Sequence, residues 1–272
     1  MQKIIFDNRR LKVFGIIPAR YASTRFPGKP LVRLAGYAMV EWVYRRAAMA
    51  FDVVAVATDD ERIVEAVRSF GGNAIMTSPE HRSGTDRCAE AMELMQQELG
   101  EEADVVVNVQ GDEPFVAPEL LSRLAACFNN ESTQIATVVK PFEDVEELLN
   151  PNNVKAVMTA EGRAIYFSRS PIPYLRGFAQ SEWLNRHVFY WHLGLYAYRA
   201  DVLRRVTQLQ PSPLEIAESL EQNRWLENNF CINAIMTKEE NIAIDTPEDL
   251  EMAEKIVSSF KFQVSGLKSQ VS

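Results

Sequence analysis

Cysteine and histidine are scarce in this sequence, and neither is spaced for a disulfide framework or a zinc site. The cysteines Cys88, Cys127 and Cys231 lie far apart, and their odd number leaves no complete set of pairs. This pattern predicts free thiols in a reducing compartment, the cytoplasm. The three histidines, at positions 81, 187 and 192, do not occur at the spacing of zinc ligands.

Long apolar runs and an excess of positive charge are missing as well. No stretch approaches the roughly 20 apolar residues of a membrane-spanning helix, and the first residues do not read as a signal peptide. The 37 Asp and Glu residues outnumber 29 Lys and Arg residues, which gives a formal net charge of −8. A general nucleic-acid binder needs a basic face, so this balance argues against one and favours a small anionic ligand.

Several common catalytic motifs are also absent. The sequence contains no P-loop, no G-x-G-x-x-G and no G-x-S-x-G. It does contain an apolar run that ends at Pro18 and is followed by a loop with Arg20, Arg25 and Lys29. A buried strand with a cationic loop at its carboxyl end is typical of phosphate sites in α/β folds. The alternative is an ordinary basic surface turn.

Hydrophobic periodicity predicts an α/β fold over most of the chain. Short apolar runs predict strands at 53–57, 74–76, 105–109, 193–198, 232–236 and 242–244. Apolar residues at helical spacing predict helices at 61–70, 83–99, 118–128, 214–225 and 247–257, the first capped by Asp59 or Asp60. The alternation indicates a Rossmann-like, mostly parallel sheet flanked by helices. We expect one domain over 12–257, with flexible ends at 1–11 and 258–272.

The pattern changes after about residue 150. Apolar runs at 154–158 and 164–167 predict an antiparallel hairpin, so about 150–199 is expected to form an antiparallel insertion. This segment contains Trp183, Tyr190 and Trp191, a higher aromatic content than a solvent-exposed loop should have, which indicates a dimer interface. The alternative is that these side chains pack against the chain's own core.

Two aspartates stand where predicted strands end. Asp112 follows the run 105–109, and Asp245 follows 242–244. Mg²⁺ prefers carboxylate oxygens and usually takes one or two of them, with phosphates and water completing its shell. These positions therefore predict a magnesium-assisted phosphate-transfer site. An ordinary Gly-Asp turn is the alternative for Asp112, and helix capping explains Thr246 and Asp249 without explaining Asp245.

Ordered motifs along the chain resemble one known family. They are Ile-Pro-Ala-Arg-Tyr-Ala-Ser-Thr-Arg-Phe-Pro-Gly-Lys-Pro-Leu (17–31), Val-Ala-Thr-Asp-Asp (56–60), Ser-Gly-Thr-Asp-Arg (83–87), Asn-Val-Gln-Gly-Asp-Glu-Pro (108–114), Tyr-Phe-Ser-Arg-Ser-Pro-Ile-Pro (166–173), His-Leu-Gly-Leu-Tyr-Ala-Tyr-Arg (192–199), Leu-Glu-Gln (220–222) and Asp-Thr-Pro-Glu-Asp-Leu (245–250). In this order they resemble the 3-deoxy-manno-octulosonate (Kdo) cytidylyltransferases, or CMP-Kdo synthetases. Sialic-acid cytidylyltransferases share the strand and cationic loop but not the whole set.

The resemblance implies a nucleotidyltransferase and a role for each matching residue. The activity would transfer CMP from CTP to the anomeric hydroxyl of Kdo, with Mg²⁺, in a cytoplasmic homodimer that serves lipopolysaccharide biosynthesis. The implied nucleotide-binding residues are Pro18, Ala19, Arg20, Ser23, Thr24, Arg25, Lys29, Thr77, Ser78, Ser83, Gly84, Asp86 and Asp112. The implied sugar-binding residues are Gln110, Arg169, His192, Tyr196 and Glu215. Arg20, Lys29, Asp112 and Asp245 would be catalytic, and the two aspartates would bind the metal.

Two other activities stay open at this point. A related cytidylyltransferase could act on 8-amino-Kdo or a sialic acid, and a nucleotide-binding protein could lack turnover. The chain also departs from the family pattern, since Asn223, Asn229 and Ala243 stand where the family has Leu, Gly and Gly. These departures affect the expected sugar pocket and dimer contact rather than the phosphate loop.

Overall fold

The computed structural model describes residues 11–22, 26–239, 243–244 and 246–259. Its strands are β1 (Val13–Pro18), β2 (Arg33–Leu34), β3 (Tyr37–Ala38), β4 (Val53–Thr58), β5 (Ala74–Met76), β6 (Val105–Asn108), β7 (Ile135–Pro141), β8 (Lys155–Met158), β9 (Ala164–Ser168), β10 (Tyr190–Arg199) and β11 (Ile232–Met236). Its α-helices are α1 (Met39–Ala50), α2 (Glu61–Ser69), α3 (Gly84–Leu99), α4 (Pro118–Ala126), α5 (Val145–Leu149), α6 (Trp183–Arg186), α7 (Ala200–Val206), α8 (Pro213–Glu218), α9 (Glu221–Glu227) and α10 (Pro247–Ser259). Short 3₁₀ turns are η1 (Lys29–Leu31), η2 (Cys127–Asn129) and η3 (Gln180–Glu182).

The central sheet is mostly parallel, as predicted. Its main path runs in the order β11-β7-β10-β6-β1-β4-β5, with β8 paired to β10 and β9 paired to β8. β1 lies between β4 and β6 and is parallel to both, and β7 is parallel to β11. β10 runs opposite to its neighbours β6 and β7. The predicted hairpin is confirmed, because β8 and β9 pair in antiparallel fashion.

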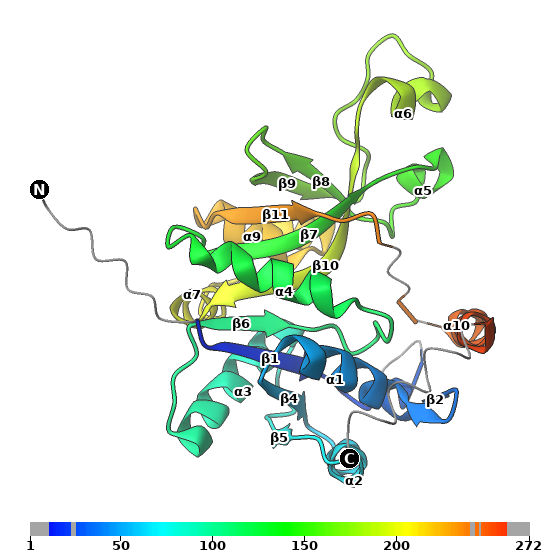
Figure 1. Ribbon diagram of the computed structural model, residues 1–272. Coiled ribbons are helices and arrows are strands. Elements are labelled where there is room, and N and C mark those ends of the chain that lie inside the picture. The colour runs from blue at the N-terminus through cyan, green and yellow to red at the C-terminus, as the bar shows by residue number, and fades with distance from the viewer. Residues whose placement is uncertain (1–10, 23–25, 240–242, 245, 260–272) are drawn as a thin grey trace, which may run out of the picture.

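Two layers of helices cover the faces of this sheet (Figure 1). α1, α2 and α4 pack their apolar stripes on one face. α3, α7 and α9 pack on the other face, where the predicted apolar side of α3 is confirmed by four buried side chains, those of Cys88, Ala91, Met92 and Met95. Burial on both faces explains why the central strands read as unbroken aliphatic runs in the sequence.

A smaller cluster joins the last helix to the hairpin near the cationic loop. Ala253 and Val257 of α10 pack with Leu34 and Trp42, and the indole Nε1 of Trp42 donates to the Leu34 carbonyl at 2.8 Å. α10 therefore lies beside β2 (Figure 1). No helix in the described part of the chain is both long and apolar enough to cross a membrane.

Two predicted elements are wrong. The single helix predicted at 214–225 is two helices, because Ser219 adopts a left-handed conformation with φ of 54° between α8 and α9. No glycine or proline marks this break, so the sequence pattern runs through it. The strand predicted at 242–244 does not form at Ala243 or Ile244, and Ile242 lies outside the described residues. The predicted flexible ends also fall largely outside the described residues.

The insertion buries several of its aromatic side chains within the chain. Trp183 is only 2% exposed, and its ring stacks on Phe189 with centroids 5.8 Å apart. Trp191 stacks on Phe142 at 5.3 Å. These contacts favour the alternative that the two tryptophans pack within their own chain. Other apolar side chains of the segment stay outside: Tyr174 is 73% exposed, Val188 52% and Phe178 42%.

Candidate active site

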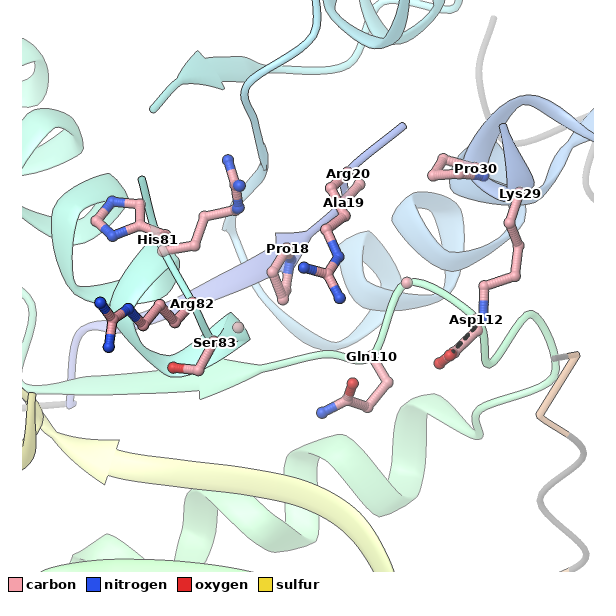
Figure 2. Close-up of a pocket in the computed structure, with 13 residues that line it drawn as sticks. Pro18, Ala19, Arg20, Lys29, Pro30, His81, Arg82, Ser83, Gln110 and Asp112 are labelled. Atoms are coloured by element: carbon pink, nitrogen blue, oxygen red, sulfur yellow. Dashed lines mark hydrogen bonds and ion pairs between the residues drawn. The ribbon is translucent and has the colours of Figure 1, made fainter. Parts of the chain in front are cut away.

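A pocket of about 250 Å³ lies at the carboxyl ends of β1 and β6, beside the N-terminus of α3. Seven of the predicted nucleotide-binding residues line it, together with the predicted sugar-binding residue Gln110. The full lining is Pro18, Ala19, Arg20, Lys29, Pro30, His81, Arg82, Ser83, Gly84, Arg87, Gln110, Gly111 and Asp112. Figure 2 shows these side chains arranged around one opening. Residues of motifs that lie far apart in the sequence therefore meet at this edge of the sheet.

Backbone hydrogen bonds hold the loops that form the pocket. The amide of Ala19 donates to the Ala57 carbonyl at 2.9 Å, which keeps the chain beyond β1 against β4. The amide of Gly28 donates to the Tyr21 carbonyl at 3.0 Å and ties the start of η1 to the chain after β1. At Gly111 an added Cβ would lie 3.0 Å from the Pro18 carbonyl oxygen, a tight contact, so glycine favours the close approach of the two loops.

One ion pair crosses the pocket. Lys29 Nζ lies 2.8 Å from Asp112 Oδ2, and both side chains are partly exposed. Arg20 is exposed and its guanidinium projects toward the loop that carries Gln110 and Asp112 (Figure 2). A partly exposed pair of this kind contributes about 0–1 kcal/mol to stability. Lys29 and Asp112 can therefore exchange each other for ligand groups at little cost.

The N-terminus of α3 forms another side of the pocket. Ser83 caps the helix, because its Oγ accepts the Asp86 amide at 3.1 Å. Ser83 and Gly84 both line the opening. Unpaired amides and the helix dipole favour negative charge at such a terminus, which suits a phosphate-bearing ligand.

Other predicted nucleotide-binding residues do not line this pocket. Thr77 is buried, donates its hydroxyl to the Thr58 carbonyl and accepts from Arg87 Nη1 at 2.6 Å. The amide of Ser78 donates to Glu90, and Asp86 faces a separate groove between α3 and α7. Ser23, Thr24 and Arg25 lie outside the described residues. The roles predicted for all six stay predictions.

Gln110 connects the pocket to the predicted sugar-binding residues of β10. Its Nε2 donates to the Gly194 carbonyl at 3.0 Å. Gly194 has φ of 74°, and the pairing of β10 with β7 shifts register between His192 and Tyr196. The left-handed backbone at this bulge favours glycine at position 194. The Gly194 carbonyl is thereby turned toward Gln110.

His192 and Tyr196 are buried behind the pocket rather than in its lining. Burial lowers the pKa of His192 to about 3, so the imidazole is neutral at physiological pH. The Thr137 hydroxyl donates to the Leu195 carbonyl, so His192 Nε2, 3.0 Å away, donates to Thr137 Oγ1. The Tyr196 ring lies 5.2 Å from that imidazole. Burial also raises the pKa of Tyr196.

Arg169 and Glu215 are engaged in contacts with their own chain. Arg169 donates from Nε to the Glu218 carbonyl at 2.7 Å and from Nη1 to the Pro151 carbonyl at 3.0 Å. Glu215 accepts the Ser212 amide at 3.1 Å in a capping box of α8 and lies 3.5 Å from Arg224. The sugar-binding role predicted for these two residues stays a prediction.

Only one of the two predicted metal ligands lies within the described residues. Asp112 lies on the pocket wall, and its carbonyl accepts the Ile244 amide at 2.9 Å, which brings the chain before position 245 to the end of β6. Asp245 itself lies outside the described residues. The described side chains form no group of three or more potential metal ligands. A carboxylate beside cations and a helix N-terminus fits Mg²⁺ held largely by phosphates and water.

The sequence patterns did not single out several lining residues. His81 and Arg82 directly precede the Ser83 cap, and His81 pairs through Nε2 with Glu90. Arg87 is buried and its Nη2 lies 2.8 Å from Asp59. A cation beside a helix start is unfavourable for the helix dipole, so Arg82 before the predicted helix was a usable signal of another role. Arg87 ends the motif at 83–87, but its burial depends on a distant partner, Asp59, which the local pattern does not show.

The departures from the family pattern have structural roles. Asn223 is fully buried, donates from Nδ2 to the Phe167 carbonyl at 2.9 Å and accepts the Phe167 amide at 3.2 Å. It therefore ties α9 to β9 where a leucine could only pack. Asn229 has φ of 63°, a left-handed conformation that asparagine tolerates better than most residues. Ala243 is exposed and belongs to no helix or strand.

A cationic loop, an acidic turn and a helix N-terminus at the strand ends of a mostly parallel sheet are an arrangement typical of α/β proteins that bind phosphate groups. A family model described as cytidylyltransferase matches residues 14–242. The chain belongs to this family, on the branch of the 3-deoxy-manno-octulosonate cytidylyltransferases.

Individual relatives support that placement. A 3-deoxy-manno-octulosonate cytidylyltransferase of Parabacteroides distasonis is 56% identical over 89% of this chain and 97% of its own length. One from Thermodesulfovibrio yellowstonii is 45% identical over 90% and 98%. A solved CMP:2-keto-3-deoxy-manno-octonic acid synthetase complexed with CTP superposes with a TM-score of 0.83 at 39% identity, over 92% of this chain and 99% of that one. A cytidylyltransferase from Leptospira borgpetersenii, at 17% identity and a TM-score of 0.60, shares the fold.

Proposed function

We propose that this chain transfers CMP from CTP to the anomeric hydroxyl of Kdo and releases pyrophosphate. The observation that carries the proposal is the similarity, over 89–90% of the chain and at 45% and 56% identity, to relatives described by this activity, combined with the pocket that the matching motifs form. A sialic acid or 8-amino-Kdo as the sugar is not favoured, because these relatives are described as acting with 3-deoxy-manno-octulosonate.

The reaction joins two anions, so the chain's first task is to neutralise and position them. Arg20 and Lys29 would bind the triphosphate and stabilise the negative charge on the departing pyrophosphate. The amides at the start of α3 would add to this field. The anomeric oxygen bonds to the α-phosphorus, the bond to the bridging oxygen breaks, pyrophosphate leaves with the electron pair, and the hydroxyl proton passes to solvent.

We infer that Asp112 and Asp245 hold Mg²⁺ during this reaction. When bound there, the ion supplies polarisation of the phosphate and a lower pKa for the attacking hydroxyl. Asp112 would leave Lys29 for the ion, while Lys29 turns to the triphosphate. No side-chain base is required along this route.

Pyrophosphate release with CTP, Kdo and Mg²⁺ tests the proposal. Turnover is expected with this pair and should fall at least tenfold when Kdo is replaced by a sialic acid, or CTP by UTP or GTP. Equal or greater turnover with another sugar acid would contradict the assignment of Kdo. Absence of pyrophosphate release with every pair would support a binding protein without turnover.

We also propose that two copies of the chain associate. The support is the set of large exposed apolar side chains on the insertion, Tyr174, Phe178 and Val188, since exposed apolar surface often marks an interface. Sedimentation equilibrium at micromolar concentration should report roughly twice the chain mass of 30.8 kDa. A monomer would contradict the dimer.

A cytoplasmic location is proposed as well, where the product would feed lipopolysaccharide biosynthesis. The location is supported by the three cysteines, which are all free thiols, as expected of a protein in a reducing compartment. Recovery of the native protein in the cytoplasmic fraction, with its activity unaffected by a reductant, is the expected result.

A further inference from the structure

The start of α3 is hydrogen-bonded to a residue that is distant in the sequence. Glu221, the first residue of α9, accepts the Ser83 hydroxyl at Oε1 over 3.2 Å and the Thr85 hydroxyl at Oε2 over 2.8 Å. Arg224 Nη2 lies 2.7 Å from the same Oε1. One carboxylate thus bonds to two residues of the first turn of α3 and its cap, across 136 and 138 positions of sequence.

These contacts bear on the pocket because of what Ser83 does there. Its Oγ accepts the Asp86 amide to cap α3 and donates its single proton to Glu221, so both sides of the hydroxyl are used. Ser83 and Gly84 line the pocket, whereas Glu221 does not. The carboxylate therefore acts on the pocket wall from behind. Without it, the Ser83 hydroxyl can rotate and the turn that presents the helix amides loses one anchor.

The other end of the link points to α8. Arg224 also donates to the Leu209 carbonyl at 3.1 Å and lies 3.5 Å from Glu215. Burial raises the pKa of Glu221, while Thr85 and Arg224 act in the opposite direction. The Glu221 carboxylate therefore accepts hydrogen bonds from Ser83 and Thr85 at the start of α3 and from Arg224 on its own helix, α9.

We propose that Glu221 is a positioning residue for the nucleotide: it fixes the Ser83–Thr85 turn so that the N-terminus of α3 is preorganised for CTP. The inference rests on the proposed function, since it takes CTP as the ligand of this pocket. A residue that only stabilised the fold would loosen both substrate sites together. A residue that positions the nucleotide wall changes CTP affinity and leaves the sugar acid largely unaffected.

Glu221→Gln is the main test, because it keeps the shape but replaces one acceptor oxygen by a donor amide. The KM for CTP and the calorimetric dissociation constant for CTP should both rise about tenfold. The KM for Kdo should stay within twofold, and kcat at saturation within about threefold. Thr85→Val removes one of the two hydroxyls and should raise the CTP values about threefold. The double variant should be no worse than Glu221→Gln alone, since both changes break the same link.

The controls separate this link from general destabilisation and from the function itself. Glu93 also lies on α3 and forms an exposed ion pair with Arg204 of α7. Glu93→Gln alters this pair and should change neither the KM for CTP nor that for Kdo. CTP affinity within twofold of wild type in Glu221→Gln, or an equal rise in both KM values, would overturn the proposal. If Glu221→Gln does not fold, unchanged CTP affinity in Thr85→Val would overturn it. Calorimetry needs no turnover, so weaker CTP binding in the variants would uphold Glu221 even if wild type released no pyrophosphate with Kdo.

Discussion

The pocket at the ends of β1 and β6 and the region around β10 and α9 are joined through Gln110, yet they are built differently. In the pocket, Arg20 is exposed and Lys29 pairs with Asp112 near solvent. Buried uncharged rings lie where β10 faces α9: Tyr196 is 6% exposed and Trp225 1%. An ion pair near solvent can be broken at a low cost in free energy when a ligand takes the place of one partner. Groups that shape a binding surface hold their positions best when they are packed.

Asp112→Asn gives the largest expected effect and tests the pocket side of this contrast. Loss of the charged ligand should lower kcat about a hundredfold or more, because the carboxylate would act on charge that develops in the reaction. The melting temperature should hardly change, since the partner contact with Lys29 is partly exposed. Pyrophosphate release and thermal unfolding measure the two quantities. Asp201→Asn, an exposed aspartate at the start of α7, is the matched control. Near wild-type turnover in Asp112→Asn at saturating Mg²⁺ would remove Asp112 from the site.

Lys29→Met should have the next largest effect and divides the two substrates. A charge-assisted contact to phosphate contributes about 1.5–3 kcal/mol, so the KM for CTP should rise roughly 10–100-fold. The KM for Kdo should change less than twofold, because the sugar acid is predicted to contact the β10 side. Initial rates with one substrate varied at a time give both constants. Lys12→Met breaks a surface pair with Glu101 and serves as the control. A raised KM for Kdo with unchanged CTP kinetics would reverse the assignment of the two regions.

The smallest effect concerns the buried side. His192 has a pKa of about 3 in the fold because of burial, and an ordinary value near 6.5 when unfolded. Between these values the unfolded chain binds more protons, so this residue makes stability fall as the pH is lowered from 6.5 towards 3. From pH 7.5 to 5.5 it should account for a loss of roughly 1 kcal/mol, which His192→Gln should remove. Urea unfolding at both pH values measures the slope, with exposed His187→Gln as the control. An unchanged slope in His192→Gln would mean that the imidazole is accessible to protons in the fold.

Local signals account for the elements that the sequence predicted well. Asp60 caps α2 by accepting the Arg62 amide, and Gly100 ends α3 in a left-handed conformation. Both devices are written in neighbouring residues and can be read without the fold. α1 follows β3 directly and has no side-chain cap at Ala38, so its start carries no such mark. β7 was not among the predicted strands, although the β-branched residues at 135–139 are typical of a strand.

The candidate site divides in the same way. Pro18, Lys29, Ser83 and Asp112 meet because strand ends and helix starts of a parallel sheet share one edge. The burial of His192 and Tyr196 could not be read from spacing, because the bulge between them changes the register of β10. The contact of Glu221 with Ser83 depends on packing between segments more than a hundred residues apart. Sequence patterns therefore locate the charged wall better than the packed one.

β10 also limits how this family can change its length. The strand has 10 residues, which extend over about 33 Å, and its ends pair with β8 at Tyr190 and with β6 at Arg199. A one-residue insertion or deletion within it would exchange inner and outer faces on one side of the change. The preceding loop around Tyr174 and Gly177 has no such register to keep. Length variation among relatives should therefore concentrate in that loop and be rare from Tyr190 to Arg199.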